Sequence, residues 1–143
     1  MILMLDEITK IIRDFAAARP EFIAAYLFGS VLRRSNPNDI DVAFLVRSHA
    51  IDESHYPFGY LAGLTSDLMA AMHRSDVDVV VLNQASPLLC MQVLRTGRSV
   101  FSRNEEERLR YEQGMRDRYI DTAPLRRIKE HYLKKRYLAH DRS

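Results

Sequence analysis

Two apolar segments of strand length, separated by a short polar segment, restrict the fold of this chain more than any other feature. The first, residues 22–28, is followed directly by a Gly-Ser pair. The second, residues 40–46, has aspartates at alternate positions, Asp39 and Asp41, where it begins. Alternate residues of a strand point to the same face of a sheet. The pattern therefore predicts two strands joined by a polar loop, with two carboxylates on one face.

Outside these segments, helical and strand-like patterns alternate along the chain. Apolar residues spaced three and four apart predict helices at residues 3–18 and 58–73. A helix at 86–95 is indicated by Ser86 as an N-cap, Pro87 in the first turn and Gly97 beyond the end. A charge-rich helix is expected at 104–119, and Pro124 separates it from a last helix at 125–138. A third strand is expected at 76–82, where continuous valines indicate burial on both faces, and a short edge strand at 99–102. Residues 47–57 are polar and indicate a loop. This order predicts an α/β fold in which a small mixed β-sheet is flanked by α-helices.

The length of 143 residues suits one main domain, which we expect at residues 1–122. A basic helical tail follows at residues 123–143, with seven lysines and arginines against two acidic residues. Such a tail can meet an acidic partner or a nucleic acid, or form a solvated helical face. Tyrosines among the arginines of the last two helices indicate either a partner interface or packing on the core. These tyrosines are Tyr111, Tyr119, Tyr132 and Tyr137.

Composition argues against several classes of protein. The net charge of +2 is too small to indicate nucleic-acid binding by itself. The single cysteine, Cys90, allows no disulfide within the chain. No apolar run approaches the roughly 20 residues of a membrane span, and the acidic start is unlike a signal peptide. We therefore expect a cytoplasmic protein that binds neither membrane nor, directly, nucleic acid.

Three aspartates from two strand segments form the candidate site: Asp39 and Asp41 from the second strand and Asp78 from the third. Oxygen ligands on rigid strands suit Mg²⁺, which takes further ligands from substrate phosphates. Two such ions can stabilise the attacking and the leaving oxygen of a displacement at phosphorus. Next to them, Gly29 lets the backbone approach a phosphate closely, and Ser30 offers a hydroxyl and an N–H group.

Each of these residues also has a purely structural interpretation. A Gly-Ser pair most often marks a turn, and Asp39 follows Pro37 and Asn38 in a turn-like segment. Asp78 is harder to explain in this way, because a carboxylate in an apolar strand is costly to bury unless it is paired or bound to metal. The functional interpretation is therefore favoured.

The segment GSVLRRSNPNDIDVAFLV resembles the signature of the nucleotidyltransferase superfamily that includes DNA polymerase β: a Gly-Ser pair, a loop, then Asp-x-Asp on a strand. The small size and the segment DVDVVVLNQASPLLCMQVLRTGRSVFSRN are similar to the minimal nucleotidyltransferases, in particular the MntA antitoxins paired with HEPN-domain (HepT) toxins. This likeness covers residues 5–120. It implies a nucleotidyltransferase fold with a C-terminal helical extension.

The resemblance assigns five residues to the site by position. Nucleotide binding falls to Gly29 and Ser30, and both catalysis and metal binding fall to Asp39, Asp41 and Asp78. The resemblance also implies the ligands: ATP is the expected substrate, and two Mg²⁺ ions are the expected cofactors.

One competing residue and one departure from the family pattern concern the neighbours of these residues. Asp76 also begins an Asp-x-Asp pattern, but the family's third acid directly precedes the apolar run, which favours Asp78. The loop between the Gly-Ser pair and the first aspartate holds eight residues, fewer than is common in the family. A shorter loop predicts a weaker grip on the triphosphate. Arg33 and Arg34 in this loop either contact phosphates or face solvent.

The implied activity is transfer of AMP from ATP onto a tyrosine of a HEPN-type toxin, with release of diphosphate. The chain would then be the antitoxin of a type VII toxin–antitoxin system and form a hetero-oligomer with that toxin. Two alternatives stay open. One is an antitoxin that acts mainly by binding its toxin. The other is a small-molecule nucleotidyltransferase, which is disfavoured because the chain has no second substrate domain.

Overall fold

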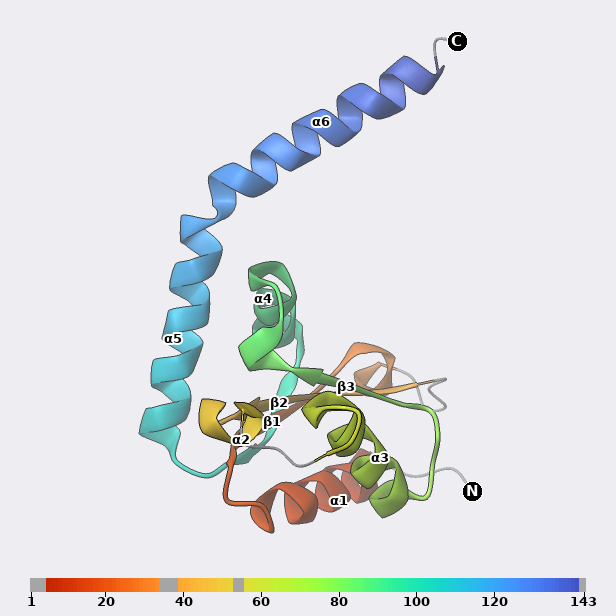
Figure 1. The fold of residues 1–143 in the computed structure, drawn as a ribbon, viewed down its shortest axis with the longest axis vertical. Coiled ribbons are helices and arrows are strands. Elements are labelled where there is room, and N and C mark those ends of the chain that lie inside the picture. Colours follow the sequence, from red (N-terminus) through yellow and green to blue (C-terminus); the bar gives the residue numbers. More distant parts are fainter. Residues whose placement is uncertain (1–4, 34–38, 53–55, 142–143) are drawn as a thin grey trace.

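A computed structural model describes residues 5–33, 39–52 and 56–141, with strands and helices alternating as the sequence predicts (Figure 1). The strands are β1 (Phe22–Phe28), β2 (Ile40–Val46), β3 (Val77–Val81) and β4 (Arg98–Ser102). The α-helices are α1 (Leu5–Ala17), α2 (Ser48–Asp52), α3 (Tyr60–Met72), α4 (Pro87–Thr96), α5 (Glu105–Asp121) and α6 (Ala123–Asp141). Two short 3₁₀ helices, η1 (Gly29–Leu32) and η2 (Leu82–Gln84), follow β1 and β3.

The four strands form one mixed sheet in the order β3-β2-β1-β4. Strand β1 is antiparallel to both β2 and β4, whereas β2 and β3 are parallel. The predicted mixed sheet and the edge position of β4 are thus confirmed. The expected burial of the third strand on both faces is wrong, because β3 lies at the other edge and its middle residues are partly or fully exposed. A run of valines could not distinguish an edge strand from a central one.

Two apolar layers cover the two faces of the sheet. On one face, α1 and α3 pack against side chains that include Leu27, Val42 and Phe44. On the other face, α4 and α5 pack against Tyr26 and Leu45, with Cys90 buried among them. The alternation along β1 and β2 is what separates the two layers, since neighbouring residues point to opposite faces. Asp41 belongs to the face that α4 and α5 cover.

The segment predicted as a loop at residues 47–57 contains the short helix α2, so that expectation is wrong in part. A single helical turn has no periodic pattern of its own, and here contacts from elsewhere in the chain hold it. Ile51 packs against the main core, and the preceding Arg47 makes two hydrogen bonds to Glu107 of α5. Tertiary contacts therefore decide the conformation of this polar segment.

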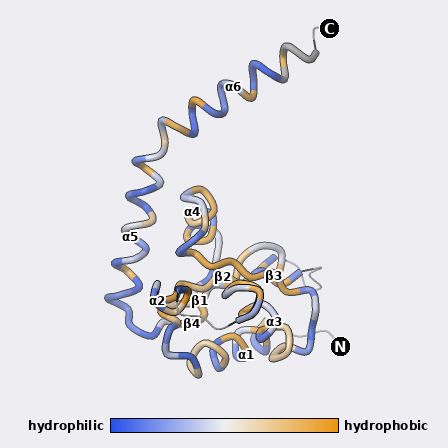
Figure 2. Tube along the Cα trace, in the orientation of Figure 1, coloured by the Kyte–Doolittle hydropathy of each residue, from blue (hydrophilic) through white to orange (hydrophobic). Residues whose placement is uncertain are grey.

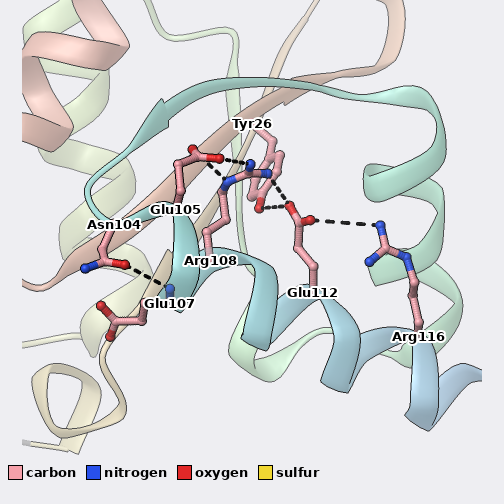
Figure 3. A network of polar contacts seen from close by, with 7 residues as sticks. All are labelled: Tyr26, Asn104, Glu105, Glu107, Arg108, Glu112 and Arg116. Atoms are coloured by element: carbon pink, nitrogen blue, oxygen red, sulfur yellow. Dashed lines mark hydrogen bonds and ion pairs between the residues drawn. The ribbon is translucent and has the colours of Figure 1, made fainter.

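Helix α5 is attached to the sheet by a network of charged and polar side chains (Figure 3). Tyr26 of β1 donates a hydrogen bond of 2.6 Å to Glu112, which also accepts one of 2.8 Å from Arg108. Glu112 is only 5% exposed. A buried carboxylate is tolerated when it is paired and hydrogen-bonded, and the network meets this requirement.

Helix α6 extends away from the rest of the molecule (Figure 1). It begins at Ala123, where the expected tail begins, and whether residues 1–122 form a separate domain stays a prediction. Polar and apolar residues intermingle along it, unlike the apolar strands (Figure 2). In the part of the chain that the structure describes, no helix combines the length and the apolar character needed to cross a membrane.

Candidate active site

The pairing of β2 with β3 brings two of the predicted site residues together. In this parallel ladder Asp41 is the direct partner of Asp78, so the two side chains emerge on the same face of the sheet. Asp39 lies immediately before β2 and is exposed. Asp41 and Asp78, 37 positions apart in the sequence, therefore lie together at the edge of the sheet, and Asp39 is close enough to affect the charge of Asp41. We call these three aspartates the acidic cluster.

The Gly-Ser pair lies beside this cluster because β1 and β2 are antiparallel neighbours. Phe28, the last residue of β1, pairs with Asp41, and Gly29 follows with a φ of +77°. A side chain on Gly29 would overlap the Asp41 carboxylate. Glycine is thus required here twice, for its backbone conformation and for the close approach of the carboxylate. Ser30 continues into η1 and is partly buried.

The electrostatics of the cluster are unfavourable in the protein alone. Burial raises the pKa of Asp41, and the neighbouring carboxylates of Asp78 and Asp39 raise this pKa further. In residues 5–33, 39–52 and 56–141, no lysine or arginine forms an ion pair with any of these three aspartates. Like charges held together without a counter-ion favour the binding of a cation.

The argument that Asp78 is costly to bury is wrong, because this side chain is exposed. The sequence places it among valines, but β3 is an edge strand and Asp78 is near its beginning. Its position beside Asp41, rather than the cost of its burial, is what supports a role for Asp78. Exposure also leaves the carboxylate accessible to a second substrate.

Arg74 is a residue near the site that the sequence reasoning missed. Its guanidinium donates hydrogen bonds to both carboxylate oxygens of Asp76, with a distance of 2.7 Å from Nε to Oδ1. Asp76 is thereby neutralised, and this pairing lowers its pKa. Asp78 faces Asp41 instead. The choice of Asp78 over Asp76 thus has a geometric basis, and the arginine two residues before Asp76 was the available signal.

The donor groups of the acidic cluster determine what kind of metal site it can form. Within the described residues, no three acidic, histidine or cysteine side chains converge closely enough to enclose an ion by themselves. Mg²⁺ commonly binds only one or two protein carboxylates and completes its shell with water and substrate phosphates. The paired oxygens of Asp41 and Asp78 beside Gly29 fit this mode of binding. They do not fit a site made of protein ligands alone.

The loop between the Gly-Ser pair and Asp39 is described only in part. Arg33 is exposed, and its backbone N–H donates to the carbonyl of Ser30. Arg34 and the rest of the loop to residue 38 lie outside the described residues. The effect of the short loop on nucleotide binding therefore stays a prediction.

A mixed sheet with a Gly-Ser turn beside Asp-x-Asp and a third aspartate on the neighbouring strand is the arrangement of a nucleotidyltransferase. Residues 10–106 match the family described as "Polymerase beta, Nucleotidyltransferase". The chain therefore belongs to the polymerase β-type nucleotidyltransferase family.

Within this family, the chain is similar to antitoxins of known structure and to a protein adenylyltransferase. The chain is 30% identical over 106 residues to the protein adenylyltransferase MntA of Shewanella oneidensis, which covers 73% of this chain and 69% of the relative. A chain from a crystal structure of a toxin–antitoxin with AMP-PNP aligns with a TM-score of 0.66 and 25% identity, covering 92% of this chain and 99% of that one. A chain from the complex of tri-AMPylated S. oneidensis HEPN toxin with MNT antitoxin aligns with a TM-score of 0.62 and 26% identity. The alignment covers 90% of this chain and 94% of that one.

Proposed function

We propose that this chain is an antitoxin that transfers AMP from ATP to a tyrosine of a HEPN-type toxin. The observation that carries the proposal is the pairing of Asp41 with Asp78 directly beside Gly29. The relatives support the choice of reaction, because one is named a protein adenylyltransferase and another is a complex with an AMPylated toxin. The proposal places the protein in the cytoplasm, where ATP and such a partner would meet.

The reaction is a displacement at the α-phosphorus of ATP. The phenol oxygen of the acceptor tyrosine forms a bond to this phosphorus, while the bond to the β-phosphate oxygen breaks and diphosphate leaves. The proton of the phenol passes to a base, and Asp78 is the candidate because its carboxylate is exposed on the acidic face. Gly29 and Ser30 would hold the phosphates through their backbone and through the Ser30 hydroxyl.

Asp39, Asp41 and Asp78 would hold Mg²⁺, and we propose two ions. When bound, the metal neutralises phosphate charge and lowers the pKa of the attacking hydroxyl. The chain's own contribution is to keep the carboxylates together, with no ion pair from a lysine or arginine of the described residues, so that their charge is available. Positioning and charge neutralisation supply most of the rate enhancement in such a site.

The proposal is tested by incubating the protein with ATP labelled at the α-phosphate, Mg²⁺ and the purified, unmodified cognate toxin. Wild-type protein is expected to label the toxin, and mass spectrometry should place AMP on a tyrosine. The double variant Asp39→Ala/Asp41→Ala should give no label. A matched control is Asp76→Asn, which removes a neighbouring carboxylate that Arg74 already neutralises and should keep most of the activity.

Two outcomes would contradict this proposal. If the toxin is inhibited by wild-type protein but carries no label, the chain is an antitoxin that acts by binding. If label appears on a small molecule and not on the toxin, the chain is a small-molecule nucleotidyltransferase. Equal loss in the Asp76→Asn and double variants would show that the acidic cluster has been assigned to the wrong residues.

A further inference from the structure

Helix α6 carries large apolar side chains that nothing in the described chain covers. Leu125, Ile128, Tyr132, Leu133 and Leu138 are all exposed. Exposed apolar residues that occur singly need no explanation, but a group of them on one element marks an interaction surface. Packing of this helix on the core, one of the two sequence-based interpretations, is therefore wrong for Tyr132. The side chain of Tyr137 is outside the described part.

Most of these side chains lie on one side of the helix. Leu125, Ile128 and Tyr132 are three and four residues apart, which aligns them along one face, and Leu133 borders it. Leu133 and Leu138 flank this face on opposite sides of a helix with 3.6 residues per turn, about 80° from Leu125 and about 80° from Ile128 respectively. Of the two, Leu133 lines the groove against α4. The helix thus has an apolar face and a polar face.

The apolar face continues into a groove between α6 and the beginning of α4. The groove has a volume of about 420 Å³, and its apolar lining includes Leu88, Leu125 and Leu133. Arg126, Lys129 and Glu130 of α6 also line it. Two elements therefore contribute to one surface that combines apolar side chains with two basic groups and one acidic group.

The direction of α6 is set by contacts at its first turn. Arg126 donates hydrogen bonds of 2.6 Å to the Tyr119 carbonyl and to the Thr122 hydroxyl. Its guanidinium also lies 3.8 Å from the centre of the Tyr119 ring, and Arg95 of α4 lies 5.2 Å from the same ring. These contacts join the ends of α4, α5 and α6. A helix held in this way is ordered before a partner arrives, which lowers the entropic cost of binding.

The charge of α6 indicates the chemistry of its partner. The helix Ala123–Asp141 contains six lysines and arginines and two acidic residues, a net charge of +4 with histidine neutral. A complementary surface is rich in carboxylates and has an apolar centre. Nucleic acid fits less well, because its affinity comes mainly from phosphate contacts, which leave exposed leucine and isoleucine side chains uncovered.

We propose that the apolar face of α6, with the groove against α4, is the docking surface for the toxin, through an acidic patch of the toxin with an apolar centre. This inference rests on the proposed function for the identity of the partner. The residues of this surface are separate from the acidic cluster on β2 and β3. Binding and catalysis then depend on different residues.

The experiment compares paired variants in titrations against the purified, unmodified cognate toxin by isothermal titration calorimetry. Leu133→Asp is expected to weaken binding at least tenfold, because hot spots at interface centres commonly reach about this size. Its matched control, Leu138→Asp, starts from a similar exposure (55% and 59%) but flanks the apolar face on the side away from the groove, and should change binding less than about threefold. Lys129→Ala should likewise weaken binding more than Lys134→Ala, and the difference should shrink at high salt.

The outcomes separate this inference from the proposed function. If wild-type protein labels the toxin but Leu133→Asp and Leu138→Asp bind equally well, the docking surface is elsewhere while the proposed function stands. If wild-type protein neither binds nor labels the toxin, the proposed function fails. Sedimentation of the chain alone that shows a dimer sensitive to Leu133→Asp would overturn the inference in favour of self-association. RNA binding that Lys129→Ala and Lys134→Ala weaken equally would overturn it in favour of nucleic acid.

Discussion

Two kinds of carboxylate in this protein differ in whether neighbouring side chains neutralise their charge. Glu112 of α5 is buried and accepts hydrogen bonds from Tyr26 and Arg108 (Figure 3). Asp41 and Asp78 lie side by side at the edge of the sheet, with no ion pair to a lysine or arginine of the described chain. The fold therefore neutralises an acid where it connects two elements and leaves acids un-neutralised at the candidate active site.

The difference shows which charges serve stability and which serve function. A buried carboxylate with its partners holds the structure together, and removing one partner is costly. A cluster of like charges lowers stability, so it persists where a ligand supplies the opposite charge. Asp76 supports this distinction. It lies only two residues before Asp78, yet Arg74 neutralises it.

The largest effect is expected from Asp41→Asn. We expect adenylyl transfer to fall at least about 1,000-fold, since a positioned charge at a phosphoryl-transfer site is worth several kcal/mol. Stability should stay unchanged or rise by up to about 1 kcal/mol, because the repulsion from Asp78 and Asp39 is relieved. Initial rates and urea unfolding of the same samples measure the two effects.

The thermal stability gained on binding Mg²⁺ provides a second measurement on the Asp41→Asn variant. Wild-type protein with a non-hydrolysable ATP analogue should gain thermal stability from Mg²⁺, and Asp41→Asn should lose most of this gain. A variant that is inactive and also destabilised by several kcal/mol would instead mean that Asp41 has a structural role. The comparison between the two groups of carboxylates would then be wrong.

Glu112→Ala should give the converse result. Loss of the buried carboxylate leaves Arg108 and the Tyr26 hydroxyl without their shared acceptor, and we expect the free energy of unfolding to fall by about 3 kcal/mol. Adenylyl transfer per folded molecule should change little below the unfolding transition. Glu112→Gln serves as the control, because it keeps an acceptor for Tyr26 and should destabilise the protein less. Equal loss of activity and stability in Glu112→Ala would show that α5 and the site are coupled.

The sequence was sufficient for the residues whose pattern is local. Alternation from Ile40 to Val46 and the Gly-Ser pair gave both central strands, and Asp41 follows from its place in that alternation. Ser86, Pro87 and Gly97 marked α4 correctly, with the Ser86 hydroxyl accepting from the Leu89 N–H. Each of these signals depends on neighbours within a few residues.

Features that depend on distant residues could not be predicted in this way. The edge position of β3, and hence the exposure of Asp78, is a property of strand order. Helix α2 is held by the core contact of Ile51, whose partners are far away in the sequence. The pairing of Asp41 with Asp78 could be inferred only through the family resemblance, because register between parallel strands leaves no local pattern.

The smallest effect concerns Asp67, a third kind of carboxylate. The hydrogen bonds from Arg19 and Tyr56 lower the pKa of Asp67, whereas the pKa of Asp41 is raised by burial and by its acidic neighbours. A lowered folded-state pKa contributes stability that is present above the unfolded pKa and is lost as the pH falls through the folded one. Because this carboxylate is 38% exposed, we expect only about 0.5 kcal/mol.

Urea unfolding between pH 7 and pH 3 therefore distinguishes the two aspartates by sign. Asp67→Asn should be less stable than wild type at pH 7, and this difference should shrink on acidification as the wild-type carboxylate becomes protonated. Asp41→Asn should be as stable as wild type or more so at pH 7, and that advantage should also shrink, because protonation relieves the repulsion in wild type. As the pH falls, wild type thus loses stability relative to Asp67→Asn and gains stability relative to Asp41→Asn. Slopes of the same sign for both variants would mean that the charge of Asp41 is already compensated in the folded protein, and the contrast between paired and unpaired carboxylates would not hold.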